Sequence, residues 1–267
     1  MIKLLAIDMD GTCLDSRSRM SDRTIQALRK AADAGVVIVP TTGRALTCLP
    51  YRLAGEKGLY RYVISSNGAQ VTDLVKKCAI FRSLIDRKTA FSFLRECRGQ
   101  HIGRMTHINH LYLLQGRLFF MLGRIIYGRD ADQAHRVRNM ENTIRRSKYD
   151  VEEIQIYYMS RNAEASIRKI LRKYPELSAA YTKAYVEIFS KETSKGAALA
   201  ALSEYLQIQK EEIACIGDGE NDLSMFAESG LRIAMGNAVP QLKEAADVVT
   251  ASNNENGVAE AIEKYIL

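Results

Sequence analysis

Short apolar runs that stop abruptly at polar residues are the feature that most constrains the fold of this chain. Residues 4–7 and 36–39 are continuously apolar, which is the pattern of strands covered on both faces of a sheet. Between them, Ser21 is a suitable N-cap for a helix with one apolar face, and Gly35 is a suitable end. A third strand is expected over 62–65. Strands that alternate with helices predict a parallel α/β sheet.

The C-terminal part of the chain resumes this pattern. A helix is expected from about residue 195, followed by a strand over 213–216, a helix to about 228 and a strand over 231–235. A short strand at 248–249 and a terminal helix over 258–265 complete the series. We therefore expect both ends of the chain to contribute to one doubly wound sheet.

The segment between these two parts differs in charge and in pattern. Residues 83–188 contain 19 Lys and Arg against 11 Asp and Glu, giving +8, whereas the remainder contains 19 against 20, giving −1. After a hairpin over 69–81, we expect helices over 86–97, 131–146 and 162–173, and strands over 102–107, 111–115, 118–126, 154–159 and 185–189. This mixture predicts an inserted α+β domain with an antiparallel sheet. The predicted domains are a core of residues 1–82 and 189–267 and an insertion of residues 83–188.

The composition narrows the class of protein. A chain of 267 residues with 47% hydrophobic and 26% charged residues is typical of soluble globular proteins. No apolar run approaches the roughly 20 residues that span a bilayer, and we expect no secretory leader because the start runs directly into a strand. The five cysteines are odd in number and show no C-x-x-C spacing, which favours reduced thiols. We therefore expect a cytoplasmic protein.

Polar side chains follow the predicted strands where each strand ends. Asp8 and Asp10 follow the first strand, and side chains two apart on an extended chain point the same way, about 6–7 Å from each other. Thr42, Asn67 and Asp218 follow three other strands. Ligands of parallel α/β sheets bind at the carboxyl ends of the strands. The acidic pair suits a magnesium site or a nucleophile beside a general acid; a solvated acidic loop is the alternative.

Four short motifs stand in order along the whole chain. They are D-M-D-G-T at 8–12, T-T-G-R at 41–44, S-K-G at 194–196 and G-D-G-E-N-D at 217–222. In this order and spacing, with the insertion between the second and third motifs, the chain resembles the haloacid dehalogenase (HAD) superfamily phosphatases of the Cof type, with a subfamily IIB cap. The resemblance implies a Rossmann-like core, a cap that selects the substrate, and a Mg²⁺-dependent phosphoric monoester hydrolase.

The resemblance also implies a role for each motif residue. Asp8 would take the phosphoryl group as an aspartyl-phosphate, while Asp10 would protonate the leaving alcohol and then activate water. Mg²⁺ would be held by Asp8, the backbone carbonyl of Asp10 and Asp218, with Asp222 in or beside this shell. Thr42 and Lys195 would bind the phosphoryl oxygens and offset their charge. Further substrate contacts are expected from Gly43, Arg44, Asn67 and Asn221.

Some of these residues also have simpler explanations. Thr42 is a suitable N-cap for the helix that follows it. Lys195 could be a solvated lysine, although a cation at a helix N-terminus is unfavourable without an anion nearby. Residues 217–222 could form a calcium-type loop, but the chain lacks the glutamate that the EF-hand pattern requires at its twelfth position. Cys13 stands where the family usually has an aliphatic residue, and we interpret it as packing.

The middle segment raises three further hypotheses: a zinc site, a basic surface for an anionic substrate, and a nucleic-acid role. His101 and His107 share a strand face, but His110 lies on the other face, and no cysteine or carboxylate completes a convincing zinc site. The basic charge could attract an anionic substrate or form a solvated surface. A nucleic-acid role would need stacking aromatic residues among the basic ones. The candidates for such stacking are Tyr112, Phe119, Phe120 and Tyr127.

We therefore expect a Mg²⁺-dependent phosphatase that acts on small phosphorylated metabolites, such as sugar phosphates or similar phosphomonoesters, and that has no membrane partner. One alternative is a phosphomutase of the same fold. The other is a non-enzymatic regulator that binds nucleic acid through the basic cap. No motif in the cap indicates the substrate, and the sequence does not indicate the oligomeric state.

Overall fold

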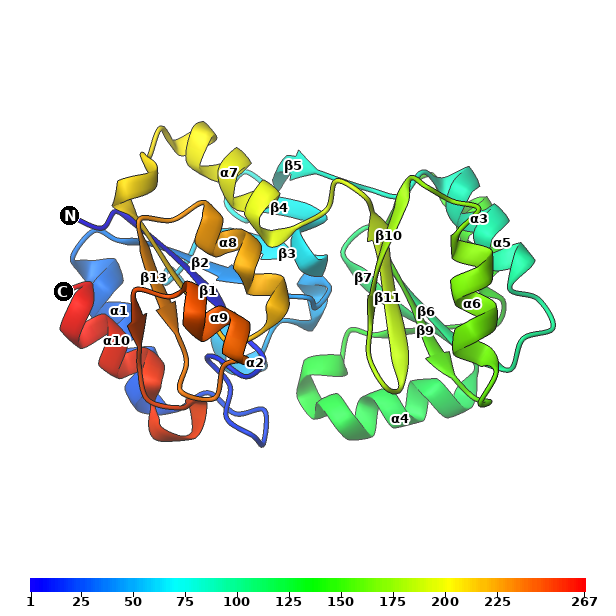
Figure 1. Ribbon diagram of the computed structural model, residues 1–267, viewed down its shortest axis with the longest axis horizontal. Coiled ribbons are helices and arrows are strands. Elements are labelled where there is room, and N and C mark those ends of the chain that lie inside the picture. The colour runs from blue at the N-terminus through cyan, green and yellow to red at the C-terminus, as the bar shows by residue number, and fades with distance from the viewer. The chain divides into compact units, whose positions relative to one another are not determined.

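An eight-stranded sheet forms the centre of the first of two units in the computed structural model (Figure 1). The structure describes residues 1–267 apart from the side chains of Ile126 and Tyr127. The first unit consists of Met1–Arg44, Leu49–Arg82 and Ser194–Leu267, and the second of Ala45–Cys48 and Ser83–Thr193. The α/β class expected for the core and the α+β class expected for the insertion are both confirmed.

The strand order of the first sheet places the two ends of the chain side by side. The order is β14-β13-β12-β1-β2-β3-β4-β5. Strand β1 (Leu4–Asp8) lies between β12 (Ile213–Gly217) and β2 (Val37–Thr41) and is parallel to both. Both β1 and β12 are buried along their whole length, as expected for parallel strands covered on both faces. The remaining strands are β3 (Tyr62–Ser65), β4 (Gln70–Asp73), β5 (Cys78–Arg82), β13 (Leu231–Ala234) and β14 (Val248–Val249).

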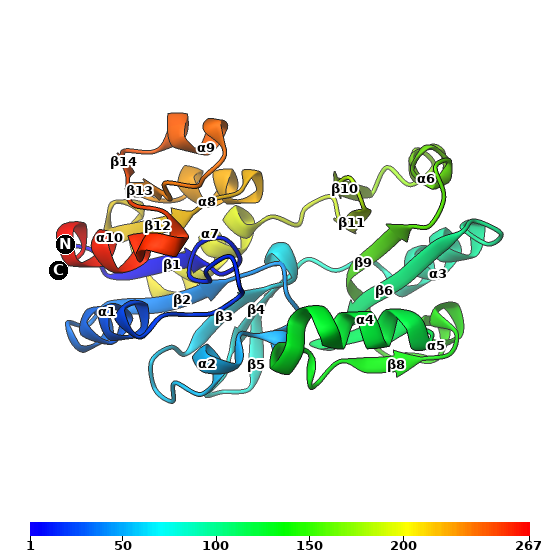
Figure 2. The ribbon, with the colours of Figure 1, turned by 90° about the horizontal axis from the view of Figure 1, so that it is seen from below.

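Helices complete the first unit. Helix α1 (Asp22–Asp33) begins where the Ser21 hydroxyl accepts the backbone N–H of Thr24 at 3.1 Å, and Gly35, with a φ of +91°, turns the chain after it. Helix α10 (Gly257–Tyr265) lies beside α1 (Figure 2). The other helices are α2 (Tyr51–Ala54), α7 (Lys195–Leu206), α8 (Leu223–Ala227) and α9 (Pro240–Ala245). Helix α9 was not expected from the sequence.

The second unit is built on a six-stranded sheet in the order β10-β11-β9-β6-β7-β8. All neighbouring strands are antiparallel except β7 and β8, which are parallel. The strands are β6 (Ile102–Ile108), β7 (Leu111–Gln115), β8 (His135–Val137), β9 (Val151–Tyr158), β10 (Leu177–Tyr181) and β11 (Tyr185–Ser190). Helices α3 (Arg87–Glu96), α5 (Met140–Arg146) and α6 (Ala163–Leu171) share an apolar core with this sheet.

Within the described part of both units, no helix is long and apolar enough to cross a membrane.

Two element predictions in the second unit are wrong. The apolar run 118–126 was expected to be a strand but forms helix α4 (Arg117–Tyr127). A short apolar run does not by itself distinguish a strand from a helix. Phe119 lies so close to Gly103 on β6 that a Cβ at that glycine would be 2.2 Å from the Phe119 ring. The helix expected over 131–146 is interrupted, since β8 pairs with β7 and α5 starts only after the N-cap Asn139.

The core of the second unit gives a test of its packing. Phe93 on α3 is fully buried and packs edge-on against Tyr174, with ring centroids 5.5 Å apart. We expect Phe93→Ala to lower the free energy of unfolding by about 3–5 kcal/mol, because it removes a buried ring and leaves a cavity. Urea unfolding followed by far-UV circular dichroism measures this loss. The same truncation at Phe91, a partly buried residue of the same helix, should cost clearly less; equal losses would contradict the packing described here.

Candidate active site

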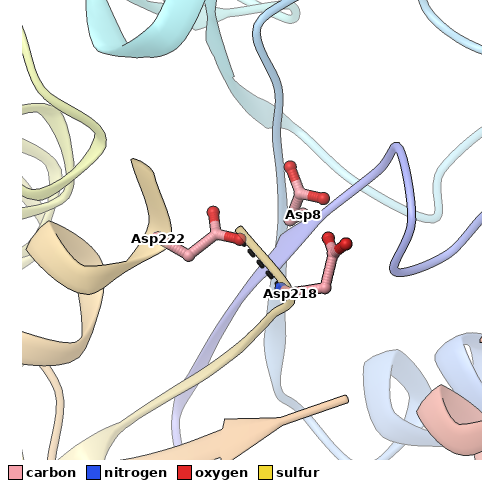
Figure 3. Close-up of side chains that lie close together, drawn as sticks. All are labelled: Asp8, Asp218 and Asp222. Carbon is pink, nitrogen blue, oxygen red and sulfur yellow. Dashed lines mark hydrogen bonds between the residues drawn. The ribbon is translucent and has the colours of Figure 1, made fainter. Parts of the chain in front are cut away.

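Three carboxylates meet at the carboxyl edge of the first sheet (Figure 3). Asp8 is the last residue of β1, Asp218 follows β12 directly, and Asp222 ends the short 3₁₀ turn Glu220–Asp222. Their ligand oxygens lie within 4.8 Å of one another. Asp8 and Asp222 are buried and Asp218 is half-buried. The parallel sheet thus brings together three acids from opposite ends of the chain.

Lys195, the first residue of α7, supplies the cation of this cluster. Its Nζ atom lies 2.6 Å from Oδ1 of Asp8 and 2.7 Å from Oδ1 of Asp222, and its side chain is 1% exposed. The buried lysine is therefore an ion-pair partner and not a solvated residue at a helix start. Three carboxylates against one ammonium group leave an excess of two negative charges if all four groups are ionised.

Burial and charge shift the pKa values in opposite directions. Burial raises the pKa of Asp8 well above its usual value, Lys195 opposes this, and the neighbouring Asp222 and Asp218 reinforce it. Burial also raises the pKa of Asp218, against the hydrogen bond from Thr12. For Lys195, burial lowers the pKa, but the Asp222 and Asp8 carboxylates outweigh burial and the net shift is upward. The ammonium group thus stays charged, while the carboxylates repel one another.

Hydrogen bonds fix the loop that carries Asp218. The second carboxylate oxygen of Asp222 accepts the backbone N–H groups of Asp218 at 2.9 Å and of Gly219 at 3.0 Å. Thr12 donates its hydroxyl to Oδ1 of Asp218 at 2.9 Å. Gly11, with a φ of +85°, lets the chain approach so closely that a Cβ there would lie 2.3 Å from Asp218. Both Gly11 and Thr12 belong to the first motif, but no sequence pattern indicates which carboxylate Thr12 binds.

Asn237 is a further contact that sequence reasoning missed. Its side-chain amide donates to the carbonyl oxygen of Gly11 at 2.8 Å and lies 3.4 Å from Oδ2 of Asp218. Its side-chain oxygen also accepts the backbone N–H of Asn253 at 2.8 Å. Asn237 follows β13 in a turn, and only its position after a strand could have pointed to it.

The second motif forms a loop held by its own hydrogen bonds. Thr42 is buried, and its hydroxyl accepts the backbone N–H of Arg44 at 3.1 Å. The backbone N–H of Asn67 donates to the carbonyl oxygen of Thr42 at 3.1 Å. Asn221 donates its side-chain amide to Oδ1 of Asn67 at 3.1 Å. A Cβ at Gly43 would lie 3.0 Å from the same Asn67 oxygen, so these five candidate residues lie next to one another.

Asp10 lies outside the carboxylate cluster. Its side chain is half-exposed, and both of its oxygens accept hydrogen bonds from Arg44: Oδ2 from Nε at 2.8 Å and Oδ1 from Nη2 at 2.6 Å. Arg44 itself is buried. The two aspartates of the first motif therefore have separate cationic partners, Lys195 for Asp8 and Arg44 for Asp10.

The donor set fits a hard divalent cation. Asp8, Asp218 and Asp222 offer only oxygen ligands, which Mg²⁺ prefers, and their excess negative charge would be offset by such an ion. Among the described side chains this is the one group of three or more metal-capable residues, and it contains no histidine. His107 lies in the second unit, where burial lowers its pKa to about 3 and keeps it neutral.

Replacing Lys195 by methionine tests the electrostatics of the cluster. We expect Lys195→Met to lower the free energy of unfolding by about 3–5 kcal/mol at neutral pH, because two buried carboxylates lose their cation. A carboxyl group whose pKa is raised on folding destabilises the folded state at pH values above its unfolded pKa of about 4, and this cost vanishes below that pH. The deficit, measured by urea unfolding, should therefore shrink from about pH 7 to about pH 5. A loss of unfolding free energy that does not change with pH would indicate that only packing is lost. The control is Lys210→Met, which changes an exposed lysine and should leave the stability nearly unchanged.

Known proteins resemble this chain over almost its whole length. A sequence profile of haloacid dehalogenase-like hydrolases matches residues 5–262. The 5-amino-6-(5-phospho-D-ribitylamino)uracil phosphatase YcsE of Bacillus subtilis is 32% identical over 272 residues, which cover 100% of this chain and 96% of that protein. A haloacid dehalogenase-like hydrolase from B. subtilis of known structure has a TM-score of 0.85 at 27% identity, covering 99% of this chain and 100% of that one.

A sugar phosphatase of HAD subclass IIB shares the fold, with a TM-score of 0.83 at 24% identity over 99% of this chain and 100% of that one. The profile and the relative each match nearly the whole chain, and all four motifs lie within the matched range. The resemblance inferred from the motifs is therefore confirmed. This chain belongs to the haloacid dehalogenase-like hydrolases and is a phosphatase of that family.

Proposed function

We propose that this phosphatase hydrolyses small phosphorylated metabolites in a Mg²⁺-dependent reaction through an aspartyl-phosphate on Asp8. The observation that carries the proposal is the position of Asp8, a buried carboxylate at the end of β1, between a lysine and two further acids. A carboxylate can attack a phosphorus atom and later leave it once nearby cations neutralise the phosphoryl charge.

In the first half-reaction, a carboxylate oxygen of Asp8 attacks the phosphorus atom and the bond from phosphorus to the leaving oxygen breaks. The carboxyl group of Asp10 gives its proton to that oxygen, so that the product leaves as a neutral alcohol. In the second half-reaction, Asp10 takes a proton from water while the water oxygen attacks phosphorus. The bond between phosphorus and Asp8 then breaks, which releases inorganic phosphate and regenerates both aspartates.

The other residues bind the phosphoryl group and the metal ion. Mg²⁺, when bound, supplies positive charge that lets one anion approach another; Asp8, Asp218 and the backbone carbonyl of Asp10 would hold it, with Asp222 beside them. Lys195 offsets the charge on the phosphoryl oxygens. Thr42 and the backbone N–H of Gly43 would donate hydrogen bonds to the same oxygens. Asn67 and Asn221, which bond to each other beside Gly43, would complete the contacts.

For the substrate, we propose a phosphomonoester of a sugar or a similar polyol. The relative YcsE is named for a substrate whose phosphate is carried on a ribityl chain, which supports this class.

We also propose that residues 83–188 form the cap that selects the substrate and that residues 1–82 and 189–267 form the catalytic core. The charge of +8 on the proposed cap favours an anionic ligand. The cytoplasmic location stays a prediction.

A phosphomutase would use the same first half-reaction but return the phosphoryl group to a sugar, so that isomerised sugar phosphate would appear without free phosphate.

The nucleic-acid alternative has less support. Of its candidate stacking residues, Tyr112 is buried and Phe119 packs on Gly103 and Tyr157, while the Tyr127 side chain lies outside the described residues.

The nucleophile is tested by Asp8→Asn. We expect this variant to lose Mg²⁺-dependent release of phosphate from a generic aryl phosphate, because a neutral amide oxygen is too weak a nucleophile to replace the carboxylate. A colorimetric phosphate assay measures the loss, and circular dichroism verifies that the variant is folded. Full activity in Asp8→Asn would rule out the proposed mechanism.

The metal site is tested by thermal unfolding with and without Mg²⁺. A ligand that binds only the folded state raises the melting temperature as its concentration rises. We expect Mg²⁺ to stabilise the native protein and the control variant Glu220→Gln, since Glu220 is an exposed acid of the same loop. Asp218→Asn should lose this response because it removes one of the three clustered carboxylates. An undiminished response in Asp218→Asn would place the ion elsewhere.

A further inference from the structure

The pair formed by Asp10 and Arg44 has a geometry that fixes the carboxylate in place. The Nε and Nη2 atoms of Arg44 donate to different oxygens of Asp10, at 2.8 and 2.6 Å. Such a fork defines both the position and the plane of a carboxylate, which a single hydrogen bond or a lysine does not. The half-exposed Asp10 side chain is therefore oriented by its partner as well as by its own backbone.

The burial of the two side chains shows that Arg44 is the fixed member of the pair and Asp10 the one that it positions. The Arg44 side chain is 8% exposed, whereas that of Asp10 is 52% exposed. The backbone N–H of Arg44 donates to the Thr42 hydroxyl at 3.1 Å, and its carbonyl oxygen accepts the N–H of Ser66 at 2.9 Å. Arg44 is thus fixed to the loops that follow β2 and β3. A buried and anchored guanidinium group positions a carboxylate that would otherwise sample several rotamers in solvent.

The same geometry limits a direct role of Arg44 toward the substrate. Two of its N–H donors are engaged by Asp10, and a phosphoryl group would have to displace that carboxylate to use them. The motif resemblance implied a substrate contact for Arg44. The separate pairing of Asp8 with Lys195 and of Asp10 with Arg44 instead keeps the two aspartates apart, which suits two different tasks.

We propose that Arg44 is a positioning residue that acts through Asp10, holding its carboxylate in the orientation from which it exchanges a proton with the leaving oxygen and with water. This inference rests on the proposed function, in which Asp10 is the acid and base. Arg44 contributes to proton transfer because it restricts Asp10 to one orientation.

A double-mutant cycle tests this proposal. Arg44→Gln, Asp10→Asn and the double variant are compared in kcat and KM on one alkyl phosphate, with the inhibition constant of inorganic phosphate measured in parallel. We expect Asp10→Asn to lower kcat by about 10²–10⁴-fold and Arg44→Gln by about 10–100-fold. The double variant should be no slower than Asp10→Asn alone, and the phosphate inhibition constant should stay within about threefold of the native value.

Two further variants separate positioning from folding. Arg44→Lys keeps the charge but not the fork, so we expect it to recover only part of the kcat lost in Arg44→Gln. Arg52→Gln is the matched control, because Arg52 pairs with Asp22 away from the site and should leave the kinetics unchanged. The melting temperature of each variant shows whether the protein is folded under the assay conditions.

The outcomes distinguish this proposal from the proposed function. If Arg44→Gln lowers kcat by the same factor with and without Asp10, or weakens phosphate inhibition in proportion to its effect on kcat, Arg44 acts independently and the proposal is wrong. Full activity in Asp10→Asn would overturn the acid and base role of Asp10, and this inference with it. Loss of activity in Asp10→Asn with non-additivity in the cycle supports both.

Discussion

The ammonium group of Lys195 is the interaction on which the rest of this site depends. It lies within 2.7 Å of both Asp8 and Asp222, in a place where water is nearly excluded. Two buried carboxylates without this cation would each carry a desolvation cost of several kcal/mol. Because Asp8 comes from the first strand, Lys195 from α7 and Asp222 from the loop after β12, the site forms only when both ends of the chain have folded into one sheet.

This arrangement leaves the cluster short of positive charge, and that shortage is useful for phosphoryl transfer. Burial and mutual repulsion raise the pKa values of Asp8 and Asp218. Because the ionised carboxylates repel one another, a divalent cation that bound between them would be strongly favoured by electrostatic attraction. In the proposed reaction, a phosphoryl group adds further negative charge, which the same ion would offset. Asp10 is paired with Arg44 outside the cluster. In the proposed mechanism, it would transfer protons while Asp8 forms the bond to phosphorus.

The location of the site could be predicted from the sequence because it follows from topology. Parallel strands place their carboxyl ends at one edge, and Asp8, Thr42 and Asp218 follow three such strands. The pairing of Asp10 with Arg44 could not be predicted, since it depends on side-chain rotamers across 34 positions. The contact of Asn237 had no motif to indicate it. Helix α4 was missed because the run 118–126 was interpreted as a strand, and a short apolar run does not by itself distinguish a strand from a helix.

In the proposed mechanism, Asp8 carries the phosphoryl group during turnover. The most direct test of this step is to mix the enzyme with Mg²⁺ and a radiolabelled phosphomonoester, quench in acid after a few milliseconds, and identify the labelled peptide by mass spectrometry. We expect a transient, acid-stable and hydroxylamine-sensitive label on Asp8 that forms and decays at rates compatible with kcat. Full turnover with no label at any quench time, or a label on another residue, would contradict this mechanism.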